Sequence, residues 1–128
     1  MAEATSRIWA DEVTALVSRC ERGDPEAALL REMHRLLRVG PQDLCDPIAE
    51  ALPSGELDRL IECGATESAA LRMALKCGYH LSNGAGEMFI VTIFLIARHP
   101  AEYSFNSRSL ATAMVGALAA ALSDQAFL

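Results

Sequence analysis

The segment from Met88 to Ala97, with the sequence MFIVTIFLIA, most constrains the fold of this 128-residue chain. Thr92 is its only polar residue, and none of its ten positions carries a charge. Leaving such a segment in water costs roughly 25 cal/mol for each Å² of apolar surface that stays hydrated. It is too short for a transmembrane helix, which needs about 20 apolar residues. We therefore expect it to be covered on both faces within a folded domain.

Two conformations fit this segment. Its β-branched residues and the Asn83-Gly84 pair before it, a strong hairpin signal, favour a central β-strand. A helix is the alternative, because Glu87 at its start, Arg98 at its end and Pro100 just beyond suit the dipole and the termination of a helix. We favour the strand.

The residues around this segment predict a small sheet. Tyr79 and Leu81 alternate with His80 and Ser82, which is the period of a half-buried strand. Tyr103 and Phe105 alternate in the same way after the Pro100 turn. We expect an antiparallel sheet of strands at about 79–83, 88–97 and 102–106.

Charged residues are concentrated before this sheet. Residues 1–76 hold 9 of the 11 basic and 14 of the 17 acidic side chains, so they can form helices with a solvated face. The first helix is expected from a Thr5 or Ser6 cap to about Arg22, and the second from an Asp24 cap to about Val39. Three shorter helices are expected at about 47–52, 54–64 and 66–78, the last with Leu75 facing inward. The apolar stripe of the first helix is Trp9, Val13, Leu16, Val17 and Cys20, and that of the second is Leu29, Met33, Leu36 and Leu37.

The chain closes with a predicted helix over about 107–123. One side of it is a ridge with almost no side chains, formed by Ala113, Gly116, Ala117 and Ala120. Because a glycine inside a helix costs up to about 1 kcal/mol relative to alanine, a close approach of another backbone would explain Gly116. That backbone is either the sheet or the same helix of a second copy.

These elements predict a single domain, residues 1–128, of α+β class, with a helical N-terminal two-thirds, a small antiparallel sheet and a C-terminal helix. An all-α fold is the alternative.

Composition indicates a compartment and excludes some partners. The N-terminus has acidic residues and no apolar signal core, which predicts a soluble cytoplasmic protein. The four cysteines form no C-x-x-C pair and are expected to be buried thiols. A net charge of −6 disfavours binding to nucleic acid.

One helix face carries a row of basic residues. Arg31, His34, Arg35 and Arg38 follow one another at helical spacing in the second predicted helix. A solvated helix face, with arginine near the C-terminal end favoured by the helix dipole and pairing with the chain's many acidic residues, is the simpler interpretation, and an anionic partner is the alternative.

No catalytic constellation is recognisable. The Asn83–Gly86 stretch matches no nucleotide-binding motif, the cysteine and histidine spacing predicts no metal site, and no cofactor is predicted. The polar residues that could line a ligand pocket near the hairpin are Tyr79, His80, His99 and Tyr103.

Two principal hypotheses of function follow. The first is a non-catalytic protein-interaction or assembly module that forms a homodimer, because the second half has few charges with which to coat a surface. The second is a small-molecule-binding protein or minor enzyme with a pocket near residues 79–103. A third hypothesis is a regulator that binds an anionic partner through Arg31, Arg35 and Arg38.

Overall fold

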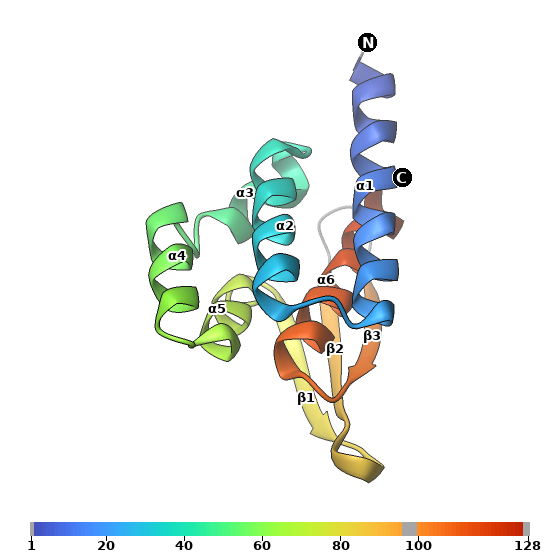
Figure 1. Cartoon of the computed structure of the whole chain (residues 1–128). Helices are drawn as coiled ribbons and strands as arrows, with labels where there is room; N and C mark the ends of the chain where they lie inside the picture. The colour runs from blue at the N-terminus through green and yellow to red at the C-terminus, as the bar shows by residue number, and fades with distance from the viewer. Residues whose placement is uncertain (1, 96–99, 127–128) are drawn as a thin grey trace.

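The α+β prediction is confirmed by a computed structural model, which describes residues 2–95 and 100–126 (Figure 1). Within these residues the chain forms six α-helices, a three-stranded antiparallel sheet and one 3₁₀ turn, so the all-α alternative is wrong. In chain order the elements are α1 (Ala2–Arg22), α2 (Glu26–Val39), α3 (Gln42–Ala49), α4 (Ser54–Glu62), α5 (Thr66–Met73), β1 (Gly78–Asn83), η1 (Ala85–Glu87), β2 (Phe89–Leu95), β3 (Ala101–Ser107) and α6 (Leu110–Ala126).

The apolar segment forms the central strand, as predicted. β2 pairs antiparallel with β1 on one side and with β3 on the other. Ile93 lies opposite Tyr79 of β1 and Tyr103 of β3, so these three side chains share one face of the sheet. Residues 96–97, the end of the predicted strand, lie outside the described residues.

Helix α6 covers that face, which we call the inner face. Val91, Ile93 and Leu95 of β2 are buried beneath it. Gly116 of α6 lies directly against Phe105 of β3, because a Cβ atom added to this glycine would stand 2.5 Å from Cγ of the phenylalanine. The close approach that the sequence predicted for Gly116 is therefore made to the sheet of the same chain.

Helices α1 and α2 pack on the side of α6 away from the sheet (Figure 1). The predicted apolar stripes of both helices face this layer, with Trp9, Val13 and Leu16 almost fully buried. Trp9 Nε1 donates a hydrogen bond of 2.8 Å to the carbonyl oxygen of Leu36, which ties the two helices together. α6 is consequently buried on nearly all sides.

Four local predictions are corrected. α1 begins at Ala2, before the expected cap, because Ala and Glu are good helix formers. The third helix spans Gln42–Ala49 rather than about 47–52, so Pro47 lies inside α3 instead of at its start, and the helix lacks the hydrogen bond that an N–H at this position would donate. α5 ends at Met73 after eight residues, well before the expected end near residue 78, and buries Ala69, Ala70 and Met73, which leaves Leu75 beyond it and 61% exposed.

The fourth correction concerns the hairpin between β1 and β2. Asn83 pairs with Phe89, and the N–H of Gly84 donates to the carbonyl of Met88 at 2.7 Å, so the loop has five residues. The left-handed backbone positions are Gly86 and Glu87, with φ of 69° and 63°. The Asn-Gly pair therefore marks the hairpin but does not form its tight turn.

The opposite, outer face of the sheet does not match the expectation of cover on both sides. Its side chains include Ile90 and Thr92, which are half-buried, and Phe94, which is 41% exposed. Thr92 shares a 2.8 Å hydrogen bond with Ser104 of β3. Among the described residues, this face is thus left as a mixed apolar and uncharged polar surface with Glu102 as its one acidic group.

None of the helices in the described residues has the length and apolar character needed to cross a membrane.

Candidate functional site

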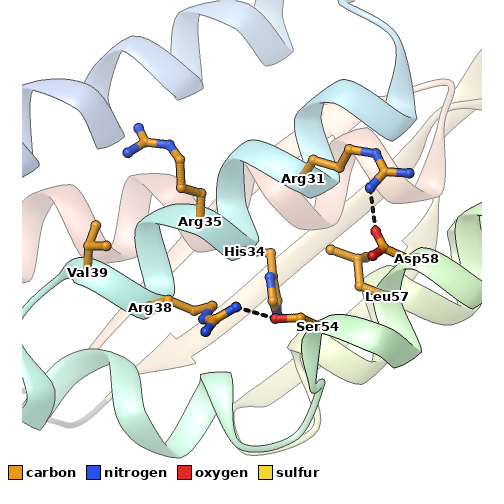
Figure 2. Close-up of a pocket in the computed structure, with 8 residues that line it drawn as sticks. All are labelled: Arg31, His34, Arg35, Arg38, Val39, Ser54, Leu57 and Asp58. Carbon is orange, nitrogen blue, oxygen red and sulfur yellow. Dashed lines mark hydrogen bonds and ion pairs between the residues drawn. The ribbon is translucent and has the colours of Figure 1, made fainter.

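The predicted basic row of α2 borders a hollow of about 430 Å³ between α2 and α4 (Figure 2). We call it the arginine groove. Helical spacing aligns its basic side chains along α2, and the loop after α3 brings α4 alongside. Its lining residues are Arg31, His34, Arg35, Arg38, Val39, Ser54, Leu57 and Asp58.

Two of the three arginines are paired within the chain. Arg31 Nη1 lies 2.5 Å from Asp58 Oδ1, across the groove. Arg35 turns toward α1, where it reaches Glu12 at 2.9 Å, and it also pairs with Glu32 at 2.6 Å. Hydrogen bonds from Arg35 hold the pKa of Glu32 below its usual range. The simpler interpretation of the basic row, internal pairing, is therefore correct for Arg31 and Arg35.

Arg38 differs from the other two. Its Nη1 donates to the Ser54 hydroxyl at the first turn of α4, and no ion pair joins it to a carboxylate of the described residues. A neighbouring hollow of about 350 Å³ shares Arg38, His34 and Ser54 with the groove. The guanidinium therefore borders two hollows, next to the end of α4 where helix N–H groups favour anions. Asp46 and Glu50 also line the second hollow, so the first hollow is the one that suits an anion.

His34 has a structural role in this groove. Its side chain is buried, and Nε2 lies 2.8 Å from the carbonyl oxygen of Leu52, to which it donates as an N–H group. This bond fastens the loop before α4 to α2. It holds the floor of the groove in place.

The predicted pocket residues near the hairpin do not gather at one point. Tyr79 lies on the inner face and His80 on the outer face of β1. Tyr103 donates to Asp124 of α6 at 2.5 Å, and burial together with this bond raises the pKa of the tyrosine. The remaining candidate, His99, lies outside the described residues.

A separate apolar hollow of about 410 Å³ lies between α3 and the start of β1. It is lined by Asp43, Leu44, Pro47, Ile48, Lys76, Cys77, Gly78, Phe94 and Leu95. Burial raises the pKa of the Cys77 thiol to about 11, so this thiol is protonated near neutral pH and is a poor nucleophile. Across the described residues, histidine, cysteine and carboxylate side chains form no group of three suited to a metal ion.

The small-residue ridge of α6 is used inside the chain. Ala113, Gly116 and Ala117 are buried, and Ala120 is half-buried beside α1. Contacts with α1 and with the sheet occupy this helix. Association of two copies would therefore use another surface in this conformation.

Strand β1 offers such a surface, which the sequence did not single out. It is an edge strand that pairs with β2 on one side only. Among the described residues, no other strand and no turn forms backbone hydrogen bonds with its free edge. Tyr79 and Leu81 of the inner face are 41% and 38% exposed, because α6 lies over β2 and β3. The alternating pattern predicted the strand, but its edge position depends on the pairing order of the sheet.

No family model, no curated protein and no solved structure matches this chain.

Proposed function

We propose that this chain is a non-catalytic protein-interaction or assembly module that self-associates through its sheet. The observation that carries the proposal is the open edge of β1, with Tyr79 and Leu81 exposed beside it. An unpaired strand edge presents backbone donors and acceptors that can pair with another strand.

The composition of β1 supports this function. Proteins that keep their sheet edges unpaired place lysine, other charges, proline or a bulge there. The sequence of β1, GYHLSN, has no lysine, no carboxylate and no proline, and its six residues pair with β2 in an unbroken register. The edge therefore lacks the features that would prevent pairing.

The outer face of the sheet adds to the same argument. Phe94 is 41% exposed there, and Ile90 and Thr92 are half-buried. An uncovered sheet face with an exposed aromatic side chain supports contact with a further surface, and pairing along β1 would leave this face open for that contact.

Sedimentation velocity over a wide concentration range tests the proposal. We expect the wild-type chain to shift from monomer to dimer as its concentration rises, and the variant Leu81→Lys to remain monomeric. The matched control is Ile8→Lys, which places the same charge on an exposed apolar position of α1, 62% exposed and away from the sheet. A wild-type chain that stays monomeric throughout would overturn the proposal.

A second candidate function, binding of an acidic peptide, is favoured by Arg38 alone. This arginine borders the groove without an ion pair to a described carboxylate, and Val39 beside it is 59% exposed. A cation with a neighbouring apolar residue suits an acidic segment that also carries an apolar side chain.

Fluorescence anisotropy with an aspartate-rich peptide tests this candidate. We expect salt-sensitive binding that Arg38→Gln abolishes and that Arg59→Gln leaves intact, because Arg59 pairs with Glu56 outside the groove. Equal loss in both variants would indicate attraction by overall charge and would contradict a specific groove.

A further inference from the structure

We propose that β1 pairs antiparallel with β1 of a second copy about a twofold axis at His80, which makes one continuous six-stranded sheet. This inference rests on the proposed self-association and specifies its geometry. The order of strands would be β3-β2-β1 in one copy, followed by β1-β2-β3 in the other.

The pleat of the strand limits the possible registers. Side chains opposite each other in an antiparallel pair point to the same face, and successive residues alternate between faces. If both copies keep α6 on the same side of the joint sheet, inner-face residues must lie opposite inner-face residues. In a symmetric pair of this kind, one residue lies opposite the same residue of the second copy. Near the centre of β1, this residue is His80 or Leu81.

The register at His80 matches the exposed side chains better. It places Tyr79 opposite Leu81 of the second copy, and the symmetry repeats this pair, so the four exposed large hydrophobic side chains on the inner faces of the two β1 strands pair with one another. Aromatic and aliphatic residues are favourable cross-strand neighbours. The register at Leu81 would instead place Tyr79 opposite the polar Asn83.

Charges beyond the two ends of β1 favour the antiparallel direction. Lys76 lies two residues before the strand and Glu87 lies four residues after it, and both are exposed. Antiparallel pairing brings the lysine end of each copy toward the glutamate end of the other. No charged residue lies within β1 itself to oppose close approach of the two strands.

Disulfide trapping tests the register. Two cysteines can be bridged only when their Cα atoms lie within about 7 Å. In a background with Cys63→Ser and Cys77→Ser, the variant His80→Cys should give a covalent dimer under mild oxidation. The matched control Ser82→Cys lies on the same face of the same strand. In this register, the cysteines at position 82 of the two chains would be four residues apart along the strand, about 13 Å.

The outcomes separate this inference from the proposed function. Efficient crosslinking of His80→Cys, with Ser82→Cys remaining free, is the expected result, and circular dichroism checks that each variant is folded. If the background protein dimerises but Leu81→Cys crosslinks instead, or no strand position does, this register is overturned while self-association stands. If the background protein and the wild-type chain are monomeric at every concentration, both are overturned.

Discussion

Replacing Gly116 with alanine tests how tightly α6 is seated on the sheet. A Cβ atom at this position would lie 2.5 to 2.7 Å from three ring atoms of Phe105. Carbon atoms in favourable contact are about 3.5 to 4.0 Å apart, so the ring or the helix must move by about 1 Å. Such overpacking costs about 1 to 3 kcal/mol, whereas alanine gains up to about 1 kcal/mol in helix propensity. We expect Gly116→Ala to lower the free energy of unfolding by about 1 kcal/mol.

Gly55→Ala provides the matched control. This glycine also lies in a helix, α4, but no atom lies within 4 Å of the position that its Cβ would occupy. With no steric cost, alanine should raise the free energy of unfolding by about 0.5 kcal/mol.

Thermal and urea denaturation followed by circular dichroism measure both variants. For a chain of this size, 1 kcal/mol corresponds to about 3 to 5 °C in Tm, so the two variants should move in opposite directions. Adding Phe105→Leu should relieve part of the cost of Gly116→Ala, which a double-mutant cycle would detect. Equal stabilisation by Gly116→Ala and Gly55→Ala would refute the reasoning, because it would mean that the ring is free to move.

Three further predictions concern buried and paired groups. His34→Phe should lower the free energy of unfolding by about 1 to 3 kcal/mol in urea denaturation, because the carbonyl of Leu52 loses its donor. N-ethylmaleimide should modify exposed Cys63 well before Cys77, whose pKa burial raises to about 11; mass spectrometry of labelled peptides measures the order. Hydrogen bonds from neighbouring arginines lower the pKa of Asp24 in the folded chain. The stabilisation by this carboxylate is therefore present above about pH 3.9 and is lost as the pH falls toward its pKa in the folded state. Asp24→Asn should flatten this part of the curve of Tm against pH.

Each of these has a contradicting outcome. An unchanged urea midpoint for His34→Phe would mean that the Leu52 carbonyl finds water. Faster labelling of Cys77 than of Cys63 would indicate an activated thiol. If the wild-type curve of Tm against pH were as flat in acid as that of Asp24→Asn, the arginines would not lower the pKa of Asp24.

The arginine groove shows how far side-chain spacing can be interpreted. Helical periodicity placed Arg31, His34, Arg35 and Arg38 on one face of α2, and the structure confirms this placement. Spacing did not identify their partners, since Asp58 and Ser54 come from α4 and Glu12 from α1. The difference between paired Arg31 and Arg38 therefore depends on how helices distant in sequence pack together.

The hairpin shows a similar division. The Asn83-Gly84 pair, the alternation before it and the β-branched apolar segment after it predicted two antiparallel strands, which β1 and β2 form. The residues that take left-handed backbone angles are Gly86 and Glu87, and a five-residue loop replaces the expected turn. Local sequence indicates that the chain reverses, but the loop conformation depends on the register in which the two strands pair.

The amino-acid sequence by itself favoured a strand over a helix for the segment after Glu87, and it predicted that helices precede this segment and that a helix follows. These features depend on periodicity and on β-branched content, which are local properties. Only the tertiary structure decided that α6 covers one face of β2, that Phe94 remains exposed on the other, and that β1 lies at the sheet edge. Those outcomes depend on which strands pair and where the closing helix docks, because an apolar pattern specifies that a residue favours burial but not which neighbour will bury it.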